Sequence, residues 1–164
     1  LEILRPMFTP DGLLTKGNCA QMSDGAAAVL ITSEDKASEL NLEPMALVRQ
    51  VANATTKRAG LLGASTQATE AALGMANLRI DEIDLVDISE SYASVAVGWQ
   101  MTQGIEFDKM NVNGGAISLG EPGGAGDVRM LTTLVHAMRR RSVDFGLYVA
   151  AGGLGATTLL LESA

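Results

Sequence analysis

The 164-residue sequence predicts an α/β fold, in which helices cover both faces of a layered sheet of mixed parallel and antiparallel strands. Short, nearly continuous apolar runs alternate along the chain with segments of helical periodicity, which is typical of a sheet buried on both faces. The apolar fraction of 47%, against 19% charged residues, is enough for a sizeable core. The last two runs are joined by Gly152-Gly153-Leu154-Gly155, which permits a tight antiparallel hairpin.

The first third of the chain is expected to contain loop, strand and helix in that order. Residues 1–25 carry several turn residues without a clean period and should form mostly loop. The apolar run 26–33, made of small and β-branched residues, predicts a buried strand, although its three alanines also favour a helix. Ser33 is placed to cap a short helix over residues 34–40, and a further strand is expected at 46–51.

Three segments with apolar residues at helical spacing follow. Helices are predicted over residues 65–76, 91–103 and 126–140. The third has a continuous apolar face, and Arg139 to Arg141 put cations at the negative end of its dipole. The apolar runs between and after these helices predict four more strands, at 85–88, 110–117, 145–151 and 157–162.

The composition excludes several classes of protein. A formal net charge of −7 argues against a nucleic-acid binder, which needs a basic surface facing the phosphates. One cysteine and one histidine form neither an internal disulfide nor a metal cluster, so no metal is expected and a cytoplasmic location is the default. No apolar stretch approaches the roughly 18 residues of a membrane span. The start resembles no signal peptide and lacks an initiator methionine, which indicates a cut inside a longer chain.

Polar residues or glycines gather at three predicted strand ends, where ligands bind in open α/β sheets. In residues 87–93, hydroxyls and a carboxylate stand at a helix start, although Ser89 could equally be an N-cap and Glu90 a favourable first-turn acid. Residues 111–126 carry six glycines before a helix whose N-terminus would attract an anion, but they contain no P-loop or GxGxxG pattern. A plain turn is the alternative there, and a plain hairpin is the simpler explanation of 152–155.

The single histidine and the single cysteine are poor catalytic candidates. His136 lies inside the predicted helix 126–140, beside its apolar face, which favours a structural position. Cys19 follows Gly17-Asn18 in a predicted loop, and no histidine stands near it in the sequence. A nucleophilic role for Cys19 is therefore open but has no partner to support it.

In order and spacing, the motifs of this chain resemble those of the thiolases. Residues 84–93, DLVDISESYA, lie where the family has its Asn-Glu-Ala-Phe motif. Residues 111–117, NVNGGAI, are close to the family pattern, and Gly120-Glu121-Pro122 occupies the family's Gly-His-Pro position. Residues 149–153, VAAGG, lie where the family has Cys-x-Gly-Gly-Gly.

The resemblance also divides the chain and implies a function. Residues 4–6, 15–18 and 23–29 resemble the last segment of a thiolase N-terminal domain, so residues 1–42 would end that domain and residues 43–164 would form the C-terminal domain. Thiolases are acyltransferases of lipid metabolism that make or break a carbon–carbon bond between acyl-CoA units. The resemblance thus implies a coenzyme A thioester as substrate, with no other cofactor. It also implies an oligomer, with the missing N-terminal domain or a second subunit as partner, and a 164-residue piece that is inactive alone.

The resemblance places three changed residues at catalytic positions. In the family, a C-terminal-domain cysteine acts as acid and base, the Gly-His-Pro histidine activates the nucleophile and helps bind a thioester oxygen, and the motif asparagine holds a water for that oxyanion hole. This sequence has Val149, Glu121 and Ser89 at those positions. Val149 cannot transfer a proton, and a carboxylate at Glu121 repels an oxyanion unless it is buried and protonated. Ordinary thiolysis or Claisen condensation is therefore not expected.

Two functions remain open for such a site. One is a thiolase-like enzyme with changed chemistry, such as aldol-type cleavage of an acyl-CoA, for which Glu90, Glu121 and Tyr92 are catalytic candidates beside Ser89. The other is a non-catalytic acyl-CoA-binding or partner subunit in a homo- or hetero-oligomer. In either case the resemblance implies that the residues kept from the family pattern bind the substrate: Asn113, Gly114, Pro122, Gly152 and Gly153.

Overall fold

Four strands form a single mixed sheet in this computed structural model, which describes residues 3–56 and 61–164. The strand order is β1-β4-β3-β2. Both β1 and β3 run antiparallel to β4, whereas β2 runs parallel to β3. The bounds are β1 (Ala46–Thr55), β2 (Leu85–Ile88), β3 (Phe145–Gly152) and β4 (Gly155–Ser163).

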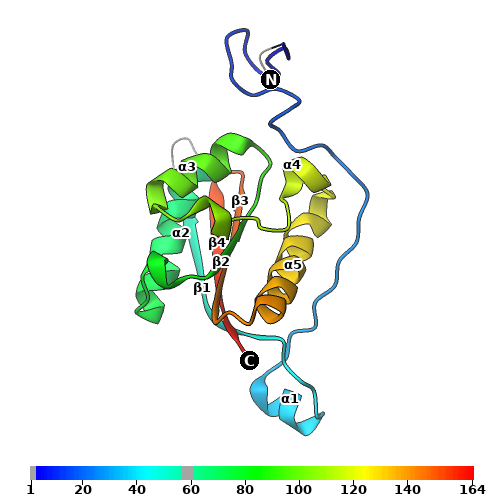
Figure 1. Cartoon of the computed structure of the whole chain (residues 1–164), viewed down its shortest axis with the longest axis vertical. Helices are drawn as coiled ribbons and strands as arrows, with labels where there is room; N and C mark the ends of the chain where they lie inside the picture. Colours follow the sequence, from blue (N-terminus) through cyan, green and yellow to red (C-terminus); the bar gives the residue numbers. More distant parts are fainter. Residues whose placement is uncertain (1–2, 57–60) are drawn as a thin grey trace.

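Helices cover both faces of this sheet, which confirms the predicted fold class (Figure 1). On one face lie α2 (Leu61–Ala76) and α3 (Ala93–Gln103). On the other lies α5 (Gly126–Arg141), preceded by the short helix α4 (Ala116–Leu119), while α1 (Glu34–Glu39) stands apart from the sheet. No helix among the described residues is long and apolar enough to cross a membrane.

The alternation of side chains along β2 and β3 divides the core into two layers. Val86, Ile88 and Val149 pack against α2 and α3 in one layer. Tyr148 packs against α5 in the other. Because Asp87 pairs with Tyr148 in the parallel register, and successive residues of a strand point to opposite faces, the Asp87 side chain also lies on the α5 face.

Two predicted strands are wrong, each for a physical reason. The run 26–33 lies mostly exposed and outside the sheet, because no segment of the described chain pairs with it and an isolated strand leaves its backbone groups unpaired. The run 110–117 is interrupted by Asn111 and Gly114 at φ values of 41° and 89°, which no extended strand adopts. Only Met110 makes a bridge to Val86 before the chain turns into α4.

The other predicted elements are confirmed, with shifted ends. Ser33 caps α1, because its hydroxyl oxygen accepts a hydrogen bond from the Lys36 amide at 3.2 Å. The predicted hairpin closes on a Gly152–Gly155 pair around Gly153, whose φ of 58° suits glycine at the first central position of a two-residue turn. The predicted helix 65–76 begins earlier, at Leu61, and β1 extends beyond the predicted 46–51.

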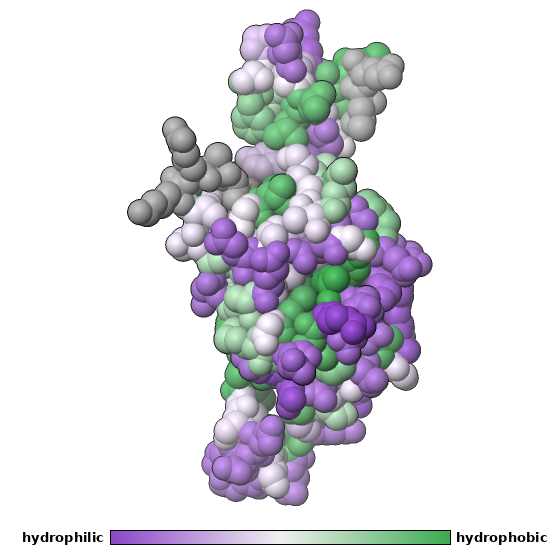
Figure 2. All heavy atoms as spheres, turned by 90° about the vertical axis from the view of Figure 1, so that its left-hand side faces the viewer, coloured by the Kyte–Doolittle hydropathy of each residue, from purple (hydrophilic) through white to green (hydrophobic). Residues whose placement is uncertain are grey.

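The segment before α1 runs over the outside of the molecule. It leaves a loop near the N-terminus and passes along the side of α4 and α5 before it reaches α1 (Figure 1). Figure 2 shows the opposite side, that of α2 and α3, where apolar surface lies among hydrophilic residues. Exposed apolar side chains of α2, α3 and the turn after α3 are Met75, Val97, Met101 and Phe107.

Candidate active site

The polar residues of the predicted site lie after the end of β2 and in the loop before α5. Ser89 and Glu90 directly follow β2, and Glu121 lies in the loop before α5. The segment around Met22 closes one side, because it forms a parallel bridge with Glu121. The amide of Glu121 donates to the Gln21 carbonyl at 2.7 Å, and the Glu121 carbonyl accepts from the Ser23 amide at 3.1 Å. This is the edge of an α/β sheet at which ligands commonly bind.

Ser89 extends the pairing of β2 with β3 by one residue. Its hydroxyl oxygen accepts a hydrogen bond from the Ala151 amide at 2.8 Å, and the hydroxyl donates to the Ala151 carbonyl at 3.3 Å. The Ser89 amide donates to the Val149 carbonyl, and the residue is buried. The Ser89 hydroxyl is thus committed to the backbone of β3, which is a structural role.

Glu90 holds the glycine-rich loop in place. One carboxylate oxygen accepts from the Asn111 side-chain amide at 2.6 Å, and the other accepts from the Ile117 amide at 3.3 Å, at the start of α4. Asn111 is in turn tied to Ile88, whose amide donates to the Asn111 side-chain oxygen at 2.8 Å. Gly115 packs against the Glu90 carboxylate, where a Cβ would collide. Sequence reasoning missed Asn111, which lies in the predicted strand 110–117.

Tyr92 lies at the start of α3 and packs against apolar neighbours. Its ring makes an edge-to-face contact with Phe8, with ring centroids 5.7 Å apart. Cys19 forms an antiparallel bridge with Tyr92 and is buried. His136 is exposed on α5, away from the strand ends.

Glu121 lies half-buried against the first residue of α5. Its carboxylate fills the space beside Gly126, where a Cβ would collide with it. Burial raises the pKa of the Glu121 carboxyl, the charge of Asp127 raises it further, and Arg129 lowers it. The protonated form of Glu121 is therefore favoured relative to an exposed glutamate.

Asp87 is a buried acid beneath this site that the sequence patterns did not single out. It is 1% exposed, and its Oδ2 atom has no hydrogen-bond partner among the described residues. Burial raises the pKa of Asp87 to about 7, the charge of Glu90 adds to the rise, and Arg129 opposes it. Arg129 itself donates to the Gly120 carbonyl at 3.1 Å. One guanidinium therefore acts on the charges of both Asp87 and Glu121.

Asp127 and Tyr148 form a hydrogen-bonded pair that the sequence patterns also did not single out. The buried Tyr148 hydroxyl donates to Asp127 Oδ1 at 2.5 Å. Asp127 is exposed and lines a cavity of about 400 Å³ that lies over the ends of β1, β3 and β4. The available signal was a polar residue inside an apolar strand run, on the same face as Asp87. The remaining lining residues are Asn53, Ala54, Thr55, Ala150, Ala151, Gly152, Gly155, Ala156 and Thr157.

Adjacent residues of β3 face opposite ways at this cavity. Val149, to which the resemblance assigns the acid/base position, is fully buried in the layer under α2 and α3. Ala150 lies on the α5 face and lines the cavity. Of these two neighbours, residue 150 lines the cavity and residue 149 does not.

The predicted substrate-binding residues do not all lie together. Gly152 lines the cavity, and Gly153 forms the hairpin turn beside it. Pro122 follows Glu121 and packs against Gly25. Asn113 is exposed and accepts a hydrogen bond from Arg140 at 3.0 Å, near the end of α5.

That contact takes the loop residue Asn113 away from the other site residues. Thirteen residues of α5 separate Arg140 from Asp127, so the two ends are roughly 20 Å apart. Gly114 follows Asn113 in the same loop. The structure thus brings Gly152, Gly153 and Pro122 to the strand ends, and leaves Asn113 and Gly114 outside that group.

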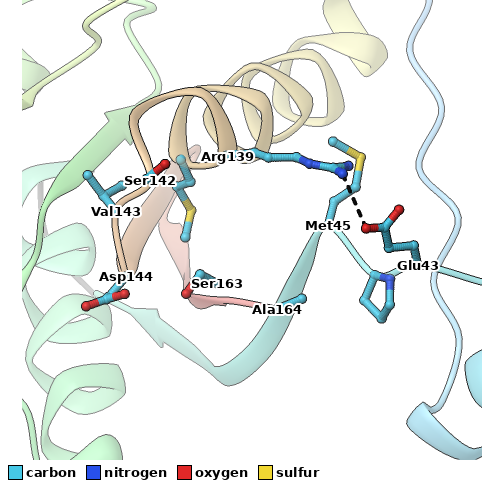
Figure 3. A pocket seen from close by; sticks show the side chains of 10 residues that line it. Glu43, Met45, Arg139, Ser142, Val143, Asp144, Ser163 and Ala164 are labelled. Carbon is cyan, nitrogen blue, oxygen red and sulfur yellow. Dashed lines mark ion pairs between the residues drawn. The ribbon is translucent and has the colours of Figure 1, made fainter.

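A second hollow of about 400 Å³ lies at the far end of α5 (Figure 3). Arg139 and Glu43 point toward each other across its rim, with 3.6 Å between the guanidinium and a carboxylate oxygen. Asp144, in the wall, directly precedes β3, so this hollow lies at the amino end of that strand. Ligands of α/β sheets bind at the other end.

The described residues hold no group of three or more acidic, histidine or cysteine side chains arranged to bind a metal. The site instead contains buried and exposed carboxylic acids, a tyrosine hydroxyl and the amino end of a helix. Such groups can donate and accept protons. The fold and these residues together define an α/β protein with ionisable side chains at its strand ends.

Comparison with known sequences identifies the family. Residues 42–163 match the family described as thiolase, C-terminal domain, and residues 1–35 match thiolase, N-terminal domain. The chain therefore belongs to the thiolase family. It is 43% identical over 158 residues to an acetyl-CoA acetyltransferase of Chromobacterium violaceum, and 39% identical over 158 residues to a 3-ketoacyl-CoA thiolase of Bacillus subtilis. These alignments cover 94% and 95% of this chain, but 40% of either relative.

Solved structures share the fold. Human mitochondrial 3-ketoacyl-CoA thiolase matches with a TM-score of 0.93 at 33% identity, and Bacillus anthracis acetyl-CoA acetyltransferase with 0.94 at 28%. Each match covers 99% of this chain and 42% of the other. The human enzyme crystallised in complex with CoA matches with a TM-score of 0.89 at 32% identity. The chain thus spans about 40% of the length of the curated relatives it matches.

Proposed function

We propose that this chain is the C-terminal part of a thiolase-type protein that handles acyl-CoA thioesters by chemistry at carboxylic acids. The observation that carries the proposal is the presence of Glu121 just before α5 and of Asp127 in its first turn, in a chain whose relatives bear the names of acyl-CoA-processing enzymes. The division at residue 42 and a cytoplasmic location are part of the proposal.

Ordinary thiolysis is disfavoured by the three changed positions that the resemblance identifies. The Ser89 hydroxyl is engaged with Ala151, and Val149 is enclosed in the core. Glu121 cannot stabilise an oxyanion as a carboxylate, and burial raises its pKa above that of an exposed glutamate.

An aldol-type cleavage needs only groups of this kind. A carboxylate accepts the proton of a β-hydroxyl group, the oxygen lone pair forms a carbonyl, and the bond between the α and β carbons breaks. The electron pair of that bond forms the thioester enolate, which a carboxylic acid then protonates at the α carbon. The balance is complete without an oxidant, a reductant or a metal.

A non-catalytic acyl-CoA-binding subunit is the second candidate. It is favoured by the structural roles of Ser89 and Glu90, whose polar atoms are occupied by the backbone and by Asn111. In this case the fold would serve assembly with a thiolase N-terminal domain or a second subunit in a homo- or hetero-oligomer.

Turnover by the purified natural gene product separates the two candidates. We expect cleavage of a β-hydroxyacyl-CoA, followed by chromatography of the released acyl-CoA, to exceed thiolysis of acetoacetyl-CoA by added CoA. Because Glu121 would accept the proton of the β-hydroxyl group, Glu121→Gln should lower cleavage by roughly 100-fold. Glu70→Gln, an exposed glutamate on α2, is the matched control and should change nothing. Undiminished cleavage by Glu121→Gln would remove the aldol proposal, and binding without turnover would favour the subunit.

A further inference from the structure

The cavity beside α5 contains one ionisable group. Of the described residues that line it, Asp127 alone carries a charge, and the others are small, hydroxylated or amide residues. Alanines and glycines of β3 and β4 form the wall beside it, and the side chains of Asn53 and Thr157 bond to each other at 2.6 Å. A ligand in this cavity therefore meets a single acid or base.

Asp127 is held in one orientation from beneath. The hydroxyl of Tyr148, 2% exposed in the core, donates to Asp127 Oδ1 at 2.5 Å. Burial raises the pKa of Tyr148 above its ordinary value, and the hydrogen bond to Asp127 adds to the rise, so the phenol keeps its proton and stays the donor. With Oδ1 engaged in this way, the carboxylate reaches the cavity from a fixed position.

Strand β3, which borders the cavity, provides no second acid or base. Tyr148 and Ala150 lie on the α5 face of β3, and Val149 between them points into the opposite core layer. Ala150 offers a methyl group, which neither accepts nor donates a proton. The acid/base group of this cavity must therefore come from the helix.

We propose that Asp127 is the general base and acid of this cavity, and that Tyr148 is the positioning residue that fixes its carboxylate. The proposal rests on the proposed handling of acyl-CoA thioesters. The Asp127 carboxylate takes a proton from the α carbon of a bound acyl thioester, and the C–H electron pair becomes the enolate, with its charge on the thioester oxygen. The reverse step returns the proton to the same carbon, so atoms and electrons balance without a further reactant.

The charges around Asp127 come from three parts of the fold. Glu121 precedes the helix, Arg129 lies two residues after Asp127, and Asp87 lies on β2. Negative charge at the first turn of α5 is favoured by the helix dipole, and Arg129 offsets the charges of Glu121 and Asp87.

Exchange of the α protons of an acyl-CoA in D₂O tests this step directly, because it needs neither a nucleophile nor a leaving group. Exchange would be followed by proton NMR with the purified natural gene product, and binding of the same acyl-CoA by calorimetry. We expect Asp127→Asn to lower exchange by about 100-fold or more, with affinity unchanged. Asp35→Asn, in the exposed first turn of α1, is the matched control and should leave exchange unchanged.

Tyr148→Phe tests the positioning role. The rate at saturating acyl-CoA should fall by roughly 10-fold while the affinity holds. A merely structural tyrosine would not produce this selective loss of rate at unchanged affinity.

The outcomes separate the two proposals. Binding with exchange at the wild-type rate in Asp127→Asn would overturn the role of Asp127 and leave acyl-CoA handling intact. Binding without exchange in the wild type would do the same. Absence of acyl-CoA binding would overturn the proposed function, and the role of Asp127 with it.

Discussion

Asp87 is a carboxylic acid whose buried position on β2 raises its pKa to about 7. The residue faces α5 next to Tyr148, where water does not reach it, and its Oδ2 atom lacks a partner among the described residues. A buried charge without full hydrogen bonding is costly, so the neutral form is favoured. The acid is thereby poised to titrate near neutrality.

Asp87→Asn should change how stability depends on pH. The folded-state pKa of about 7 lies above the ordinary aspartate pKa of 3.8, so the native state binds the proton more tightly than the unfolded state. The stabilisation from this group is complete below the unfolded-state pKa and is lost as the pH rises through 7. The variant removes this loss, and its stability relative to wild type should rise by at most about 3 kcal/mol between pH 5 and pH 8.

Urea unfolding of both proteins at the two pH values provides the measurement. The exposed Asp108→Asn is the control, and its difference from wild type should be the same at pH 5 and pH 8. A difference for Asp87→Asn that does not change with pH would show that Asp87 stays ionised in the folded protein.

At the scale of elements, a row of three hydrogen-bonding side chains connects α3, α2 and β4 inside an apolar core layer. The Trp99 indole donates to the Thr69 hydroxyl oxygen at 3.1 Å, and the hydroxyls of Thr69 and Thr158 lie 3.4 Å apart. All three residues are fully buried. Because an indole N–H buried without an acceptor is costly, this chain fixes how the two helices sit on the sheet.

Thr69→Val should lower the free energy of unfolding by about 1–3 kcal/mol, because the substitution keeps the shape but leaves the Trp99 N–H without an acceptor. Urea denaturation followed by tryptophan fluorescence would measure the loss. Thr66→Val on the same helix is the matched control, since the Thr66 hydroxyl is buried without a partner among the described residues and its removal should cost nothing. Equal effects of the two variants would contradict a structural role for the hydrogen bond.

At the scale of the whole molecule, the chain has two parts that differ in packing. Residues from β1 onward share the sheet and its two core layers, whereas residues 24–33 lie mostly exposed. That run includes Leu30 and Ile31, which are 79% and 76% exposed. Apolar side chains in such a run favour a partner surface, in agreement with the proposed N-terminal domain or second subunit.

Hydrogen exchange of the 164-residue chain should separate these parts. Amides of residues 24–33 have no backbone acceptor in the described part of the chain and should exchange within seconds, while the amides of β3 and β4 exchange orders of magnitude more slowly. Mass spectrometry of peptides from each region provides the measurement, with β2 as an internal reference. Protection of 24–33 equal to that of β4 would contradict the exposed arrangement.

Helix α5, the hairpin of β3 and β4, and the fold class followed from sequence alone, because each depends on a period or a turn residue that neighbours in the chain reveal. Motif order predicted Ser89, Glu90 and Glu121 as site residues, but it could not predict their hydrogen bonds. The strands predicted at 26–33 and 110–117 were wrong because pairing partners and positive φ angles, and not apolar content, decide whether a run becomes a strand.

Sequence alone therefore determined the family resemblance, the α/β class and the position of the site at the strand ends. Only the tertiary structure decided which residues meet there. Tyr148 and Asp127 lie 21 positions apart, and Asp87 and Tyr148 lie further apart still. Their contacts depend on the parallel register of β2 with β3 and on the placement of α5 over that pair. Side-chain alternation then sends Val149 into the core, because a shift of one residue along a strand reverses the face.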